Sequence, residues 1–260
     1  TRYVVQRSTE PGGPYRKLAE VSEPSFEDTT ATKGELYYYV IHAANDVGAS
    51  NSSAVLAASA GLPGNWLNRD IGEVGVPGFA EYNGTKFTLE GEGKDIGGES
   101  DELHFVYTPM KGDAAIEARI VLPMSSQWTK PGVMIRNSLD SDSAHASVLL
   151  LPQLWSGALV CRQEKGGKTR EIGNTRLPET HIEKRNRLMK PFWVRLSREG
   201  SRFTGSMSSD GEHWTTLGET EVSMDGVVYV GLPACSQLNK VTTTVTYDNV
   251  RVSESAQTSR

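Results

Sequence analysis

The feature that most constrains the fold of this chain is a series of short runs in which apolar and polar residues alternate. Residues 3–8 and 193–197 are two such runs, and their period of two is that of a β-strand with one buried face. Turn residues separate the runs, for example Glu10-Pro11-Gly12-Gly13 and Asp210-Gly211. Runs that recur between turn signals in this way are typical of β-sandwiches. The sequence therefore predicts an all-β fold.

The chain divides at Gly61-Leu62-Pro63-Gly64, where the pattern changes and small residues form a hinge. We expect one domain over residues 1–60 and a larger one over residues 61–256. The number of runs in the larger domain predicts two packed sheets, as in a jelly roll. Its strands are expected at residues 87–89, 103–107, 115–122, 132–136, 145–151, 158–163, 193–197, 203–208, 227–232 and 242–252.

Composition excludes several classes of protein. The formal net charge of -5 argues against a nucleic-acid partner, because such proteins usually carry a basic balance. No stretch approaches the roughly 20 apolar residues of a membrane-spanning helix. Cys161 and Cys235 are too few for a zinc site of about four ligands, and we expect two buried thiols, with a disulfide between them as the alternative.

The first domain resembles the second half of a bacterial fibronectin type III domain. The residues that carry the resemblance are Gly12-Gly13-Pro14-Tyr15, Gly34-Glu35-Leu36-Tyr37 and Ala43-Ala44-Asn45-Asp46-Val47-Gly48. It implies that the Tyr37 hydroxyl bonds to the backbone of the neighbouring loop. The first two strands of that family have no counterpart, so we expect the natural N-terminus to precede Thr1. Either the chain was cleaved, or another chain or fragment completes the sheet.

The second domain resembles the concanavalin-A-like (laminin-G-like) jelly-roll domains of large secreted bacterial proteins. The resemblance rests on a set of segments: Asp70-Ile71-Gly72, Asp101-Glu102-Leu103, Pro131-Gly132-Val133-Met134-Ile135-Arg136, Trp193-Val194-Arg195-Leu196, Ser209-Asp210-Gly211 with Trp214, and Tyr247-Asp248-Asn249-Val250. It implies an extracellular or cell-surface location and, less specifically, carbohydrate binding. The stretch between Thr169 and Trp193 is longer than this family leads us to expect, and it holds the basic residues Lys184, Arg185, Arg187 and Lys190. We interpret it as a solvated loop or short helix, with a docking loop for an acidic glycan or a partner protein as the alternative.

No catalytic constellation is expected. A retaining glycosidase needs two carboxylates on one face about 5 Å apart, and the nearest cluster is Glu90, Glu92 and Asp95. Its two glycines and lysine indicate a turn that leaves a strand. The five histidines have no metal-ligand spacing.

Sugar binding needs an aromatic platform with polar side chains around it. Trp155 is the main candidate, because it sits in an expected turn, and Trp128 is the second. Arg136, His145, Arg162 and Gln163 are expected on neighbouring strands, where they could face a concave sheet. The alternatives are loop or rim packing for the tryptophans and a hydrogen-bonded polar layer for the arginines and the histidine. Trp66, Trp193 and Trp214 are assigned to structure, because each adjoins an apolar strand.

Jelly rolls of this kind often carry a structural Ca²⁺ where the first and last strands meet, which makes Asp70 and Asp248 candidate ligands, with turn capping as the alternative. The sequence thus predicts a non-catalytic module that binds a polysaccharide or glycan within a larger secreted protein. The main alternative is a structural or assembly domain that contacts other proteins without binding sugar. A glycosidase is the third and weakest hypothesis.

Overall fold

The computed structural model describes residues 1–121, 128–183 and 188–254 of the chain. The chain forms two compact units, Thr1–Asn68 and Arg69–Arg260, and the boundary between them falls within strand β5 (Leu67–Ile71). Within the described ranges the only helices are the short 3₁₀ turns η1 (Pro152–Leu154) and η2 (Glu179–His181). The predicted all-β fold is confirmed. None of the described helices has the length and apolar character that a membrane crossing requires.

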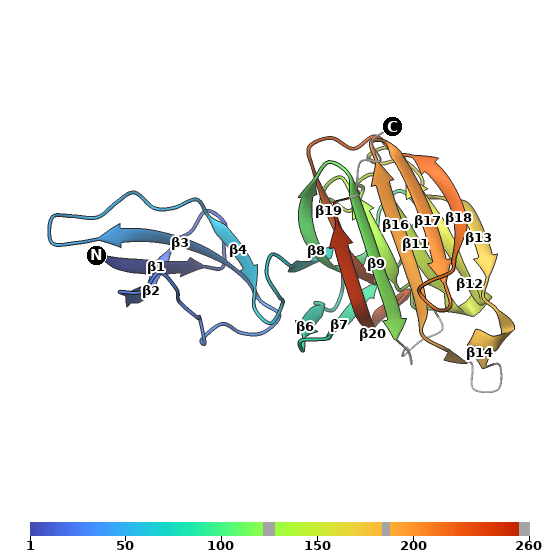
Figure 1. Ribbon diagram of the computed structural model, residues 1–260, viewed down its shortest axis with the longest axis horizontal. Helices are drawn as coiled ribbons and strands as arrows, with labels where there is room; N and C mark the ends of the chain where they lie inside the picture. The colour runs from blue at the N-terminus through green and yellow to red at the C-terminus, as the bar shows by residue number, and fades with distance from the viewer. Residues whose placement is uncertain (122–127, 184–187, 255–260) are drawn as a thin grey trace. The chain divides into compact units, whose positions relative to one another are not determined.

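The first unit is one antiparallel sheet of four strands in the order β2-β1-β3-β4 (Figure 1). Thr32 N–H donates to the Tyr37 hydroxyl (3.2 Å), which is the loop contact that the fibronectin resemblance implies. Large apolar side chains are exposed on this unit, including Ile41 (40%) and Leu56 (59%). The strands are β1 (Arg2–Ser8), β2 (Arg16–Val21), β3 (Leu36–Ala44) and β4 (Leu56–Ser59).

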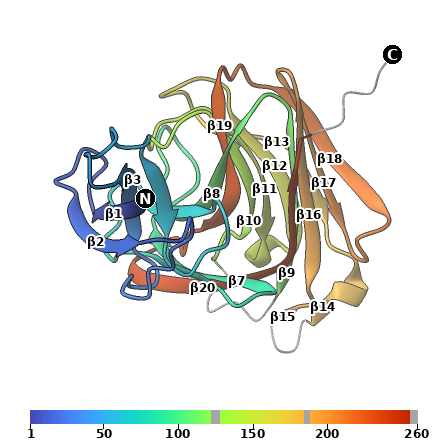
Figure 2. The same cartoon turned by 60° about the vertical axis from the view of Figure 1, so that its left-hand side comes forward.

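The second unit is a sandwich of two seven-stranded sheets (Figures 1 and 2). The first sheet has the order β13-β12-β11-β10-β19-β8-β5, and the second sheet has the order β18-β17-β16-β9-β20-β7-β6. A two-stranded ribbon, β14 (Ile182–Glu183) with β15 (Leu188–Met189), stands apart. The first sheet consists of β5, β8 (Leu103–Lys111), β10 (Gly132–Arg136), β11 (His145–Leu151), β12 (Ser156–Arg162), β13 (Arg170–Arg176) and β19 (Val227–Ala234). The second consists of β6 (Phe79–Tyr82), β7 (Lys86–Gly93), β9 (Ala114–Val121), β16 (Phe192–Glu199), β17 (Arg202–Ser208), β18 (Trp214–Glu221) and β20 (Leu238–Ser253).

The two sheets differ in how they are buried. Strands β10 and β11 are buried at every position, so the centre of the first sheet is covered on both faces. The second sheet is covered on one face only: in β16, Val194 and Leu196 are buried, whereas Trp193 and Arg195 are partly exposed. This alternation is the sequence pattern that predicted the strand. The second sheet therefore presents one face to solvent.

Two local predictions are wrong. Residues 170–176 were expected in a loop or short helix but form β13, the edge of the first sheet. The turn expected around Gly91 and Gly93 is the end of β7, because neighbouring backbone packs closely there. A Cβ on Gly91 would lie 2.4 Å from the Ala234 carbonyl oxygen, and one on Gly93 would lie 1.8 Å from that of Glu102.

The two cysteines are free and buried, as expected for two thiols. The basic residues Lys184, Arg185 and Arg187 lie outside the described residues. The assignment of the first unit to the fibronectin type III family and the boundary after residue 60 both stay predictions.

Candidate functional site

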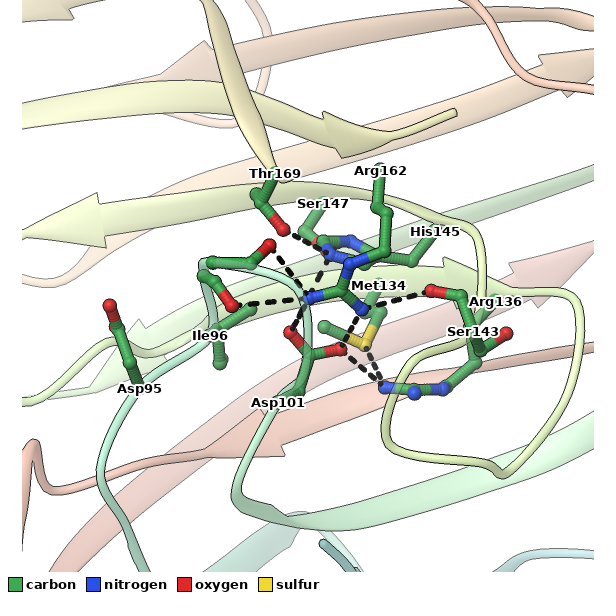
Figure 3. A network of polar contacts seen from close by, with 12 residues as sticks. Asp95, Ile96, Asp101, Met134, Arg136, Ser143, His145, Ser147, Arg162 and Thr169 are labelled. Carbon is green, nitrogen blue, oxygen red and sulfur yellow. Dashed lines mark hydrogen bonds and ion pairs between the residues drawn. The ribbon is translucent and has the colours of Figure 1, made fainter. Parts of the chain in front are cut away.

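A buried cluster of charged side chains surrounds Asp101 at one end of the first sheet (Figure 3). Asp101 precedes β8, whereas Arg136 and Arg162 are the last residues of β10 and β12. The Asp101 carboxylate accepts hydrogen bonds from Arg162 Nη2 (2.7 Å), Arg162 Nη1 (2.9 Å) and Arg136 Nη1 (3.3 Å). None of the three side chains has exposed surface.

The same guanidinium groups also hold two loops against the sheet. Arg162 donates to the carbonyl oxygens of Gly97 (3.2 Å) and Ser143 (3.0 Å), and Arg136 donates to that of Asp140 (2.5 Å). Two arginines face one carboxylate, so the cluster has an excess of positive charge. The carbonyl oxygens stabilise that charge through their hydrogen bonds to the guanidinium groups. The cluster therefore holds these loops at this end of the first sheet.

His145 lies between the two arginines, because it pairs in register with Arg136 and with Arg162. Its Nε2 is 3.8 Å from an Asp101 oxygen, and its Nδ1 is 3.0 Å from Ser147 Oγ. Burial, with help from the two guanidinium charges, lowers the pKa of His145 to about 4, so the ring is neutral at pH 7. Burial alone would raise the pKa of Asp101, but the positive groups around it hold that pKa below its usual value.

The prediction that Arg136, His145 and Arg162 face an open sheet surface is therefore corrected. Their side chains have no exposed surface, and most of their polar atoms are bonded within the protein. The structure has the alternative arrangement, a hydrogen-bonded polar layer. A glycan has no access to these side chains in this structure.

Trp155 lies far from this cluster. It is partly exposed and follows η1 in a left-handed conformation (φ 53°), and its carbonyl oxygen accepts from Leu177 N–H (2.8 Å). In the β11–β12 hairpin, His145 pairs with Arg162 at one end and Leu151 pairs with Ser156 at the other. Trp155 is thus about 20 Å from the cluster along the strands.

The other two predicted sugar contacts lie on further segments. Gln163 is exposed just after β12, and its Nε2 donates to the Glu221 carbonyl oxygen (3.2 Å). Trp128 is 45% exposed in the connection between β9 and β10, and the preceding loop residues Ser125, Ser126 and Gln127 lie outside the described residues. A sugar-binding role for Trp155, Gln163 and Trp128 stays a prediction.

The two predicted Ca²⁺ ligands do not fit a shared metal site. They lie in different sheets, Asp70 on β5 and Asp248 on β20. Asp70 bonds to His104 Nδ1 (2.8 Å), and both oxygens of Asp248 accept from Arg119 (2.7 Å each). A carboxylate that is already bound by a guanidinium is a poor ligand for a cation, because its negative charge is compensated. The described part of the chain contains no group of three or more His, Cys, Asp and Glu side chains that could hold a metal.

The carboxylates considered for catalysis differ in their exposure to solvent. Glu90 is exposed on β7, whereas Glu92 is 2% exposed. Glu92 accepts from the backbone N–H groups of Val76 and Lys240 (2.6 Å each). Its carboxylate therefore connects the segment before β6 to the beginning of β20.

An open surface that sequence reasoning missed lies on the solvent face of the second sheet. We call it the Trp–Arg face and define it by Trp193, Trp214, Arg119, Arg195, Glu117 and Asp248. Its residues come from β9, β16, β18 and β20, strands of one sheet (Figure 1). Arg119 pairs in register with Trp193 and with Asp248, and Ser208 on β17 lies between Trp193 and Trp214.

Each arginine of the Trp–Arg face is held by a carboxylate and lies against a tryptophan. Arg195 donates to Glu117 Oε2 from Nε (2.9 Å) and Nη2 (2.5 Å), and its guanidinium carbon lies 3.7 Å from the centre of the Trp214 ring. The guanidinium carbon of Arg119, the arginine held by Asp248, lies 5.9 Å from the centre of the Trp193 ring. These contacts fix the planes of aromatic and guanidinium groups on an open sheet.

The turn before β18 supports both tryptophans. Trp214 Nε1 donates to the Gly211 carbonyl oxygen (3.2 Å). Gly211 has φ +83°, and a Cβ there would lie 2.7 Å from the Trp193 ring. Both rings remain partly exposed.

Comparisons with known proteins show a likeness of fold to solved structures, and they assign the chain to no family. No family model matches the chain, and no curated protein matches it. Among solved structures, a functionally unknown protein from Saccharomyces cerevisiae aligns with TM-score 0.55 and 18% identity, over 74% of this chain and 96% of that one. A carbohydrate-binding module, CBM66 from Bacillus subtilis, aligns with TM-score 0.47 and 15% identity, over 72% and 94%. Lectin I-B4 from Griffonia simplicifolia, in its metal-free form, aligns with TM-score 0.43 and 11% identity, over 73% and 92%.

At these identities the likeness concerns the fold alone. The two seven-stranded sheets of the second unit agree with the jelly-roll fold class predicted for it. The structural neighbours give no support to a fibronectin type III assignment of the first unit.

Proposed function

We propose that the second unit is a non-catalytic module that binds carbohydrate through the Trp–Arg face. The observation that supports this most is the presence of two partly exposed tryptophans beside fixed arginine–carboxylate pairs on one open sheet face. An indole ring packs against the apolar face of a pyranose, and guanidinium and carboxylate groups bond its hydroxyls. This is the combination that sequence reasoning sought at Trp155 and Arg136.

The proposal differs from the sequence prediction in where the sugar binds. Arg136, His145 and Arg162 are closed off, whereas Arg119 and Arg195 keep 37% and 38% of their side-chain surface exposed. A binding role needs that accessible surface. We retain the predicted extracellular location as part of the proposal.

Retention of the full chain on a panel of immobilised polysaccharides tests the proposal. Wild type should be retained on at least one glycan, and Trp214→Ala should lose that retention while its thermal unfolding remains cooperative. Arg195→Gln should weaken retention as well, because it removes the group that lies against Trp214. Wild type that passes every column unretained, or Trp214→Ala that is retained equally, would contradict the proposal.

A specific observation favours assembly as the second candidate function. The first unit exposes Phe26 (41%), Ile41 (40%) and Leu56 (59%). Ile41 and Leu56 lie on neighbouring strands of one sheet, and exposed apolar side chains grouped in this way are typical of a protein-contact surface. Self-association measured by sedimentation, and abolished by Ile41→Ser with Leu56→Ser, would support this function.

A further inference from the structure

We propose that the ligand of the Trp–Arg face is a neutral glycan chain that runs across the strands, and this inference rests on the proposed function. The face carries two arginines and two carboxylates, so its formal charges sum to zero. Each arginine spends two N–H groups on its own carboxylate. Among the six residues that define the face, each cation is therefore paired with a carboxylate, and the further cations Lys86 and Arg251 lie at its border, beside Asp248 and Glu117.

An acidic sugar would have to compete with the carboxylates that already bind the two arginines. A carboxylate or sulfate that approached Arg195 would meet Glu117, whose oxygen lies 2.5 Å from Arg195 Nη2. At Arg119 it would meet Asp248, which is bound through both oxygens. Separating either pair would leave a partly buried carboxylate without its partner, because Glu117 and Asp248 are only 14% and 9% exposed. Anion binding at Arg119 and Arg195 is thus disfavoured.

A neutral sugar can bind without separating either arginine–carboxylate pair. A guanidinium has five N–H donors, so each arginine of the Trp–Arg face keeps three after binding its carboxylate. The carboxylate oxygens keep free lone pairs beside those donors. Donors and acceptors at neighbouring positions match adjacent sugar hydroxyls, each of which can donate and accept.

The row of residues on the sheet gives the direction of the chain. Trp193 on β16 and Trp214 on β18 flank Ser208 on β17 at the same register level. Their backbones are two strand spacings apart, or about 10 Å, on the order of the length of two linked pyranose units. One glycan chain that crosses these strands at right angles meets both tryptophans, and Arg119 continues the same row beyond Trp193.

Affinity electrophoresis of the full chain tests the inference, with hydroxyethyl cellulose and galactomannan as neutral probes and polygalacturonate and alginate as acidic ones. Wild type should be retarded by a neutral probe, with a Kd that changes less than about twofold between about 0.05 and about 0.5 M salt. Trp193→Ala should lose the retardation, and Trp193→Phe should keep part of it.

A charge variant makes the test sharper. Glu117→Gln leaves Arg195 without its counter-charge, so this variant should gain salt-sensitive retardation in polygalacturonate. Glu90→Gln, the same change at an exposed position of the same sheet, should not. If the wild type prefers an acidic probe, and salt weakens that binding, the inference is overturned. The proposed function would still stand, and recognition would be assigned to bordering cations such as Lys86 and Arg251. Absence of retardation by every probe would contradict the proposed function itself.

Discussion

Arg195 lies against Trp214, with its guanidinium carbon 3.7 Å from the centre of the indole ring, while Glu117 accepts hydrogen bonds from Nε and Nη2 of the same guanidinium. This arrangement lies on the face of the second sheet that is open to solvent, opposite the face that packs in the core. Val194 and Leu196, the neighbours of Arg195 on β16, are fully buried and fix the strand, so Arg195 points outward. The planes that would meet a sugar are thus set by the core of the sandwich.

The buried cluster predicts a large effect of Asp101 on stability. Asp101→Asn should lower the free energy of unfolding by about 3–5 kcal/mol, because two buried guanidinium groups lose their counter-charge. Chemical denaturation measures this. The control is Asp142→Asn, which is partly exposed and 3.7 Å from Lys165, and it should change stability by less than about 0.5 kcal/mol. Equal effects of the two substitutions would contradict the role assigned to Asp101.

The burial of His145 predicts a pH dependence of stability. Its pKa is about 4 in the folded protein and about 6.5 when unfolded, so the unfolded chain takes up the proton first. Stability is therefore full above about pH 6.5 and falls as the pH drops towards 4, by on the order of 3 kcal/mol. Denaturation midpoints measured across this range for wild type and His145→Gln check the prediction. A slope that is unchanged in His145→Gln would show that other groups cause it.

The glycine below Trp193 predicts a positioning effect. Gly211→Ala should weaken glycan binding, because its Cβ would displace the Trp193 ring. Gly226→Ala is the matched control: its φ of +70° brings similar backbone strain, of about 1–2 kcal/mol, but no atom lies within 4 Å of the added Cβ. Binding titrations should separate the two variants, whereas their stabilities should fall by similar amounts. Equal affinities would contradict the prediction.

The free thiols predict slow modification. Burial raises the pKa of Cys235 to about 12, so almost no thiolate forms at neutral pH. Both cysteines should resist a thiol reagent in the native protein and react at once in denaturant. Rapid reaction of two thiols under native conditions would be inconsistent with this burial.

Short apolar runs between turn signals predicted most strands, and β10 and β11 have the bounds expected from their runs. The error at Arg136 and His145 has a physical reason that the sequence contains. Gly132-Val133-Met134-Ile135-Arg136 has no polar alternation, which is typical of a strand covered on both faces, so an arginine at its end should be buried and paired. Trp193-Val194-Arg195-Leu196 does alternate, and that pattern places Trp193 and Arg195 together on the open face.

Other features could not be read from the chain. The partners of Arg119 and Arg195 come from residues 129 and 78 positions away in sequence, because β9, β16 and β20 meet only in the folded sheet. Asp101 likewise becomes the centre of a cluster only when β10 and β12 bring their last residues to it. A single sequence without such long-range pairing cannot distinguish these carboxylates from surface ones.

The most direct test of the proposed function compares Trp193→Ala with Trp155→Ala in a titration of the polysaccharide that retains the wild type. Trp193 belongs to the Trp–Arg face, whereas Trp155 lies in a turn of the other sheet. We predict at least about a tenfold rise in Kd for Trp193→Ala, equivalent to about 1.4 kcal/mol, and no change for Trp155→Ala. The reverse pattern, with affinity lost only in Trp155→Ala, would contradict binding at the Trp–Arg face.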